Sequence, residues 1–172
     1  MRIMGKISIA FIIALLTMFA GCGKNDDREL NMITISGNEL VDHDYNQSYT
    51  TVEGLYTPVL WKCEESLEGF IINIDFLPEA IMVIYIFRTE SSETLAPGTF
   101  AISPHCTLGA EAGFELKTGA KAMELWMSSG TVTIAKDGGT YDIHFNLVID
   151  PNAGGGTLKG HFHGEMGELV LD

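Results

Sequence analysis

The sequence predicts a single all-β domain, built as an antiparallel β-sandwich or a partly closed β-barrel. Apolar and polar residues alternate with a period of two in several segments, as they do in strands that bury one face. Glycine-rich turns separate these segments, and no stretch after Cys22 keeps a helical period over the length of a helix. With 172 residues, 46% of them apolar, the chain is long enough for one core and too apolar to be disordered.

Each alternating segment is expected to be a strand. In 70–76 and 141–149 the apolar residues fall on every second position, which predicts one buried face. Segment 81–87 is apolar on both faces, which predicts a central strand or a strand covered by another element. Shorter segments of the same kind are 114–117, 123–127 and 131–134.

Turn residues divide these strands. Asp137-Gly138-Gly139 predicts a hairpin, because glycine readily takes the positive φ that tight hairpin turns need. A longer glycine loop covers 150–156, and Pro78 marks a turn after the first alternating segment. Later, Gly160 and Gly164 share a strand face with Phe162, and glycines inside a strand mark a bend or a close approach. We expect the sheet to curl around aromatic residues there.

The first residues have the pattern of a secretory signal. Arg2 and Lys6 precede an apolar run over 9–19, which ends at small residues before Cys22. The run is too short for a membrane-spanning helix. We therefore expect a cleaved signal peptide over 1–21, a flexible tether over 22–35 and the β domain over 36–172.

The junction Ala20-Gly21-Cys22 resembles the bacterial lipobox, in which the cysteine is lipidated and becomes the mature N-terminus. The resemblance implies acyl chains on Cys22, membrane partnership through that lipid, and location at the outer membrane. The following Lys24-Asn25-Asp26-Asp27 resembles the surface-export signal of Bacteroidota lipoproteins. It implies display at the cell surface, with a periplasm-facing position as the alternative.

Three later stretches resemble small secreted lipoproteins of Bacteroides and relatives. They are LAPGTF at 95–100, SGTVTIAKDGGTYDIHFNLVID at 129–150 and GGTLKGHFHGEM at 155–166. These are turn and strand signatures, and most members of that family have no assigned function. The resemblance therefore implies a lineage and a fold type, and no particular activity.

The net charge and the absence of known catalytic motifs limit the classes of function that the protein can have. The chain has 10 basic and 23 acidic residues, for a net charge of -13, which excludes nucleic acid as a natural partner. An anionic domain is also repelled by an anionic membrane, so the lipid must hold it there. We find no nucleophile elbow, phosphate loop or dinucleotide fingerprint, and we expect no catalytic residue and no cofactor.

A histidine group offers the most specific chemistry. His161 and His163 flank Phe162 and so point to the same face of one strand. A hairpin around the glycine loop would bring His144 opposite them, and three imidazoles on one face suit Zn²⁺ or Cu²⁺. Asp142 or Glu165 would then be a further ligand or would support the ligands. The alternative is three histidines on a solvated surface.

Two other predictions concern single residues. Cys63 and Cys106 could form a disulfide in an exported protein, or could be two separate buried thiols.

Trp126 alternates with apolar neighbours and is the best candidate for an exposed aromatic ring that binds a ligand, for example by stacking on a sugar.

These features together predict a lipid-anchored cell-envelope protein with a binding or structural role and no catalysis. One alternative is a lipocalin-like carrier, in which the curled sheet encloses an apolar ligand. A fimbria-like or adhesion subunit would need a donor strand or an exposed edge. An envelope enzyme would need a cleft with converging polar groups.

Overall fold

The computed structural model describes residues 31–41, 43–62, 66–88, 94–103, 107–118 and 121–168, and in this part of the chain it is all-β. Seven strands close into a mixed β-barrel, and three further strands lie outside it. The predicted fold class is confirmed. The strands are β1 (Met32–Ser36), β2 (Tyr45–Ser48), β3 (Val52–Lys62), β4 (Ser66–Phe76), β5 (Ala80–Arg88), β6 (Gly98–Ala101), β7 (Gly109–Thr118), β8 (Lys121–Asp137), β9 (Thr140–Ile149) and β10 (Thr157–Glu168).

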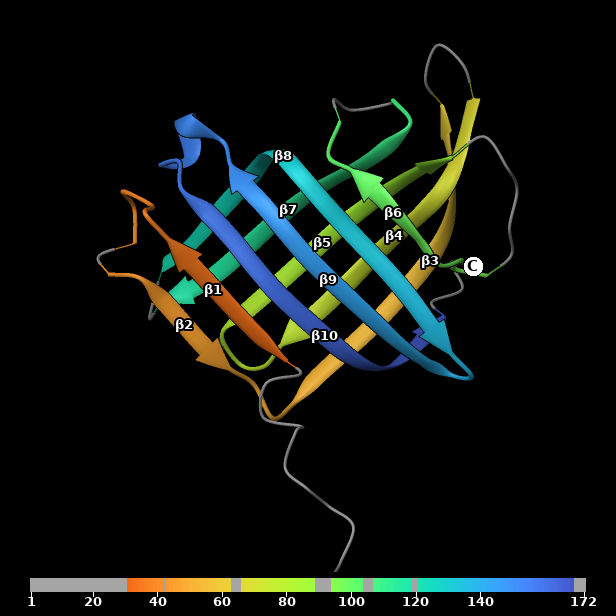
Figure 1. Cartoon of the computed structure of the whole chain (residues 1–172), viewed down its shortest axis with the longest axis horizontal. Helices are drawn as coiled ribbons and strands as arrows, with labels where there is room; N and C mark the ends of the chain where they lie inside the picture. The colour runs from red at the N-terminus through yellow and green to blue at the C-terminus, as the bar shows by residue number, and fades with distance from the viewer. Residues whose placement is uncertain are drawn as a thin grey trace, which may run out of the picture.

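The barrel follows the order β3, β4, β5, β7, β8, β9 and β10. Neighbours in this order pair antiparallel, and the barrel closes where the end of β10 pairs with β3 in parallel. Outside the barrel, β1 pairs with β10 and carries β2, while β6 pairs with β8. Figure 1 shows the result as two layers of crossing strands, with β1, β10 and β9 in front and β3, β4, β5 and β7 behind.

The long strand β8 passes from one layer to the other. Its first half pairs with β7 and its second half with β9, and the register shifts between Met127 and Ser129. Gly130 follows this bulge with a φ of 119°, and a Cβ there would lie 2.3 Å from the backbone oxygen of Asn146. A bulge bends its strand, and only glycine fits at position 130. The sequence of β8 therefore determines where this strand turns from one layer of the barrel to the other.

The barrel interior is filled by side chains. Inward positions alternate along every strand of the barrel, as the sequence predicts for 70–76 and 141–149. A barrel of about eight strands is just wide enough for its side chains to fill it. The largest fully buried side chains include Phe70, Phe76, Phe114, Phe162, Ile72, Ile74, Met82, Ile84 and Ile86.

The strand over 81–87 is central, as predicted, because β5 lies between β4 and β7. Met82 and Ile84 point inward and are fully buried, whereas Val83 and Tyr85 point outward and are half-buried. The two apolar faces therefore have different surroundings. The inner one forms the core and the outer one lies at the barrel surface.

The predicted turns are confirmed, and so is the role of the late glycines. Residues 138 and 139 connect β8 to β9, and a short 3-10 turn over Pro151–Ala153 lies in the loop before β10. Gly160 faces inward, where a Cβ would lie 2.3 Å from Cε2 of Phe145. The ring of Phe145 occupies the space that any larger residue would need, which explains the glycine.

The domain begins earlier than the sequence suggests. The tether predicted over 22–35 overlaps β1, which starts at Met32 and pairs with β10 over its whole length. This boundary was wrong because a single five-residue strand with Ile33 and Ile35 buried is too short a pattern to recognise without its partner. Cys22, Cys63 and Cys106 lie outside the described residues, so lipidation and the disulfide stay predictions.

Candidate metal centre on the outer face of the barrel

Antiparallel pairing of β9 and β10 brings the predicted histidines together. His144 lies directly opposite His161, and Asp142 directly opposite His163. Because Ile143 and its alternate neighbours are buried, the residues between them on β9 point away from the core. Phe162 is buried in the same way on β10, so all four polar side chains project from the outer face of the barrel.

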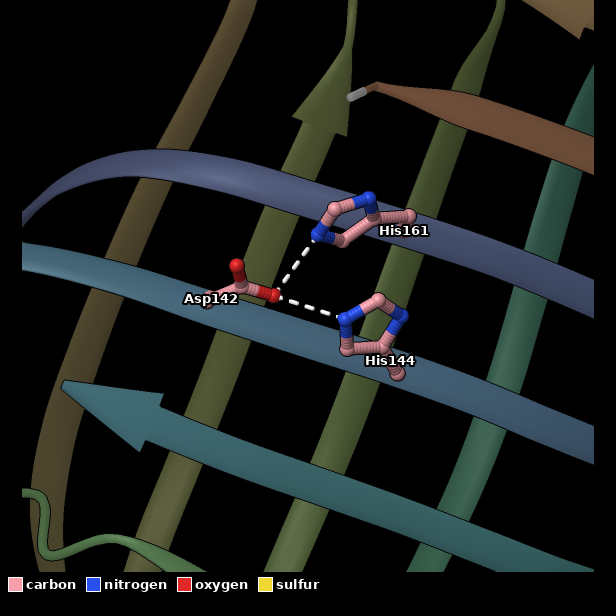
Figure 2. Close-up of side chains that lie close together, drawn as sticks. All are labelled: Asp142, His144 and His161. Atoms are coloured by element: carbon pink, nitrogen blue, oxygen red, sulfur yellow. Dashed lines mark hydrogen bonds and ion pairs between the residues drawn. The ribbon is translucent and has the colours of Figure 1, made fainter. Parts of the chain in front are cut away.

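Asp142 is the centre of this group. One of its oxygens, Oδ1, lies 2.8 Å from Nε2 of His144 and 2.7 Å from Nε2 of His161. Figure 2 shows both rings directed at that same oxygen from neighbouring strands. One ligand atom from each of the three residues lies within 4.8 Å of the others, which is close enough for a single ion to be held by all three.

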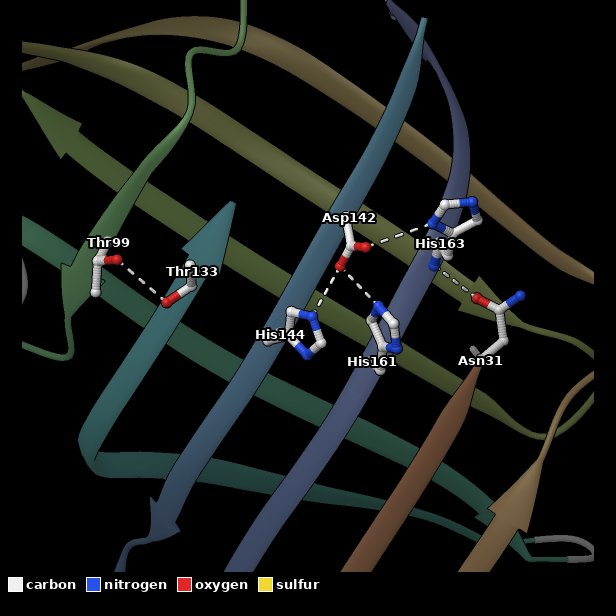
Figure 3. A network of polar contacts seen from close by, with 7 residues as sticks. All are labelled: Asn31, Thr99, Thr133, Asp142, His144, His161 and His163. Atoms are coloured by element: carbon white, nitrogen blue, oxygen red, sulfur yellow. Dashed lines mark hydrogen bonds and ion pairs between the residues drawn. The ribbon is translucent and has the colours of Figure 1, made fainter. Parts of the chain in front are cut away.

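His163 lies on the other side of the carboxylate. Its Nδ1 is 3.5 Å from Oδ2 of Asp142, and its backbone N–H donates to the side-chain oxygen of Asn31 at 2.9 Å. Figure 3 shows how these contacts continue the network toward β1. The three predicted histidines are thus brought together around Asp142. Glu165 lies further along β10, opposite Thr140, and is not part of this group in the part of the chain that the structure describes.

The electrostatics of the site depend on partial burial. The side chain of His161 is 16% exposed, whereas that of His144 is 59% exposed. Burial by itself would raise the pKa of Asp142, but the hydrogen bond from His161 and the nearby histidines outweigh it and lower the pKa below its usual value. Asp142 is therefore a carboxylate, and not a neutral acid, across the physiological range.

A depression of about 400 Å³ borders the two histidines. Its wall includes the polar side chains of Thr131, Thr133, Asn146 and Lys159, which come from β8, β9 and β10. Thr133 is further joined to Thr99 of β6 by a contact of 3.2 Å between their hydroxyl oxygens, shown in Figure 3. Met32 and Phe145 also line it, so the group opens onto a water-accessible depression with both polar and apolar walls.

Two imidazole nitrogens and one carboxylate oxygen are a donor set that suits Zn²⁺ and Cu²⁺. In the present arrangement both Nε2 atoms lie at hydrogen-bond distance from Oδ1, so each of them carries a proton that the carboxylate accepts. A metal ion would replace those protons, and the ligand atoms would have to separate to the spacing of about 3.3 Å that tetrahedral coordination requires.

The sequence predicted the three histidines, and it offered Asp142 only as one of two candidates, with Glu165, for a further ligand or a supporting residue. The central place of Asp142 depends on the register, which places it diagonally across from His161. Asn31 and Thr99 were missed altogether. Neither has a sequence signal, because Asn31 contacts His163 from just before β1 and Thr99 contacts Thr133 from β6, both far away in the chain.

Trp126 has the exposure that the sequence predicts. Its side chain is 44% exposed and lies over Gly113, in a small cleft of about 170 Å³. Val83 and Tyr85 form part of the cleft wall, with carboxylates of Glu115 and Glu124 beside them. An indole ring flanked by acceptors could stack on a sugar, and ligand binding by Trp126 stays a prediction.

Comparison with protein-family models, with curated proteins and with solved structures finds no match for this chain. In the part of the chain that the structure describes, no helix has the length and apolar character needed to cross a membrane.

Proposed function

We propose that the protein is a lipid-anchored cell-envelope protein whose β domain binds a divalent transition-metal ion, Zn²⁺ or Cu²⁺. The ligands are Asp142, His144 and His161. The observation that supports this function best is that the Nε2 atoms of both histidines converge on a single carboxylate oxygen.

The residues around the three ligands hold them in place by hydrogen bonds, as the neighbours of metal ligands do in known sites. Ligating carboxylates are themselves hydrogen-bonded in known sites, and such partners orient the ligands. Here His163 lies within reach of the second oxygen of Asp142, and Asn31 holds the backbone of His163. Three protein ligands leave a fourth position open, and the adjoining depression gives water or a small ligand access to it.

Calorimetric titration with ZnCl₂ and CuCl₂ near pH 7.5 tests this function. We expect one ion per chain, and an affinity at least tenfold lower in Asp142→Asn and in His161→Gln. His43→Gln removes an exposed histidine elsewhere and serves as the matched control. The absence of heat above dilution for both metals would overturn the proposal, as would equal binding by the wild type and Asp142→Asn.

The lipid anchor needs its own test, because it rests on the sequence pattern at Cys22. Mass spectrometry of the protein from a Bacteroidota host should find acyl chains on that cysteine. Cys22→Ser should move the protein from the membrane fraction to the soluble fraction, while metal binding by the domain stays the same. Protease treatment of intact cells would then separate surface display from a periplasmic position.

The alternative functions have weaker support. A lipocalin-like carrier needs space inside the barrel, whereas the inward side chains form one buried cluster. An adhesion subunit needs an open edge, and the outermost strands β2 and β6 have four residues each, which is typical of edges protected against pairing. An envelope enzyme is supported only by the open position at the proposed metal, and ester hydrolysis by the zinc-loaded protein would be its test.

A further inference from the structure

A second cavity, away from the histidines, lies between the end of β5, the outer strand β6 and the start of β7. Its volume is about 350 Å³, which is at the lower end of the range for small-molecule sites. The residues around it are Phe87, Arg88, Thr99, Phe100, Ala101, Leu108 and Gly109. Among the described residues, this lining has two phenylalanines, a leucine and one arginine, and it has no acidic residue.

Arg88 stands out because one of its guanidinium nitrogens is unsatisfied. Nη1 is buried and has no hydrogen-bond partner among the described residues. Buried polar atoms are nearly always paired, and a charged donor left unpaired costs more than a neutral one. Glu68 lies directly across the β4–β5 ladder from Arg88, yet it is not among the residues that line the cavity. An anion in the cavity would supply the missing acceptor.

The rest of the lining indicates what kind of anion fits. Phe87 is almost fully buried, Phe100 packs against the core, and Leu108 is 58% exposed at the rim. A guanidinium beside apolar walls suits a carboxylate that carries a short hydrocarbon chain, because the fork binds the two oxygens and the walls cover the chain. A bare inorganic anion would leave the apolar walls unused.

Close packing keeps this cavity in shape. Gly109 has a φ of 134°, and a Cβ there would lie 2.5 Å from the backbone oxygen of Ala101. The end of β6 can therefore approach β7 only because position 109 is glycine. The backbone of Ile102 also bonds to Gly130, which ties the same segment to β8.

We infer that this cavity is a binding site for a small organic carboxylate, with Arg88 as the residue that binds its oxygens. The site is distinct from the proposed metal centre, because the two cavities share no lining residue, although Thr99 of one contacts Thr133 of the other. The inference does not depend on metal binding. It also differs from a lipocalin-like carrier, since the ligand lies between the barrel and an outer strand and not inside the barrel.

Octanoate is the probe for the test, titrated into the full-length chain by calorimetry or by NMR chemical-shift mapping. We expect saturable binding that weakens at least tenfold in Arg88→Gln and by a smaller factor in Arg88→Lys, which keeps the charge and loses the fork. Lys117→Gln removes a cation outside the cavity and should bind octanoate like the wild type. Leu108→Ser should weaken octanoate binding and leave acetate binding unchanged.

Each possible result tests a different feature of the proposed carboxylate site. Undetectable octanoate binding at millimolar concentration, or equal binding by Arg88→Gln with an unchanged unfolding midpoint, overturns the site. If 1-octanol binds as well as octanoate, the role of Arg88 is wrong. If inorganic phosphate binds as tightly as octanoate, the apolar walls do not contribute and the carboxylate assignment is wrong. Zinc titration of Arg88→Gln should match the wild type.

Discussion

The imidazole rings of His144 and His161 are stacked, with their centroids 3.9 Å apart and an angle of 14° between their planes. They come from neighbouring strands and share the carboxylate of Asp142. A single negative charge can offset one imidazolium, but a second positive charge at this distance is repelled by the first. The arrangement is therefore favourable when at most one ring is charged, or when a metal ion replaces the protons of both.

Acid should weaken the fold through Asp142. Its pKa is lowered in the folded state, so its contribution is present above the unfolded pKa of about 4 and is lost as the pH falls through the lower folded value. Because the carboxylate is about one third exposed, we expect Asp142→Asn to cost less than about 1 kcal/mol at pH 6.

Urea unfolding of the wild type and Asp142→Asn from pH 3 to pH 7 measures this effect. The difference between them should begin to shrink below about pH 4 and should vanish below the lowered pKa of Asp142, where the folded carboxylate is protonated too. Asp137→Asn, at the end of β8, is the control for removal of a charge away from the histidines. A difference that stays constant down to pH 3 would show that the ion pairs do not contribute.

His161 should matter more for stability than His144. The two residues make the same contact with Asp142, but His161 is 16% exposed and His144 is 59% exposed. Burial strengthens a charge-assisted hydrogen bond, so we expect His161→Gln to cost about 1 kcal/mol and His144→Gln less than about half of that. Chemical unfolding at pH 6 measures both, and equal or reversed costs would contradict this prediction.

Gly160 should not accept a side chain. A Cβ at this position would lie 2.3 Å from Cε2 of Phe145 and 2.7 Å from Cδ1 of Ile33, so the core would have to shift. We expect Gly160→Ala to cost about 1–3 kcal/mol, as overpacking of a core does. In Gly139→Ala, no atom lies within 4 Å of the new Cβ, and the change should stay within about 0.5 kcal/mol. Thermal unfolding of both variants makes the comparison.

Ligand binding by Trp126 can be followed through its own fluorescence. The chain has two tryptophans, so Trp61→Phe leaves Trp126 as the only indole. If a sugar stacks on the exposed ring, hexasaccharides of glucose, mannose, galactose or N-acetylglucosamine should change the emission of that variant in a saturable way. Glu124→Gln, at the edge of the cleft, should weaken the response. No change with any of the four sugars would contradict the prediction.

The β character of the chain could be predicted because it depends on local patterns. Alternation over 141–149 decides which face of β9 is buried, and the glycines at 138 and 139 decide where the hairpin turns. The pairing of β9 with β10 follows from the glycine loop between them, and it was enough to place the histidines on one face. These are relationships between residues that are close in sequence.

Closure of the barrel depends on distant contacts instead. Met166 pairs with Gly54 in parallel. A local sequence pattern cannot predict a contact between two segments so far apart in the chain. The same is true of β1, four of whose five residues were assigned to the tether. It is also true of the position of β6 beside β7, which forms the cavity at Arg88. A short strand has too few residues for its alternation to be recognised in the sequence. Its partner strand is determined by the packing of the whole core.

The sequence by itself determined an all-β domain with turns at defined glycines and with histidines on the outer face of one hairpin. Only the tertiary structure decided that the sheet closes, that Asp142 lies at the centre of the histidines and that Nη1 of Arg88, beside a cavity, has no hydrogen-bond partner among the described residues. The physical reason is the range of the interactions. Alternation and turn chemistry act within a few residues, whereas strand register and unsatisfied polar atoms depend on which distant strands meet.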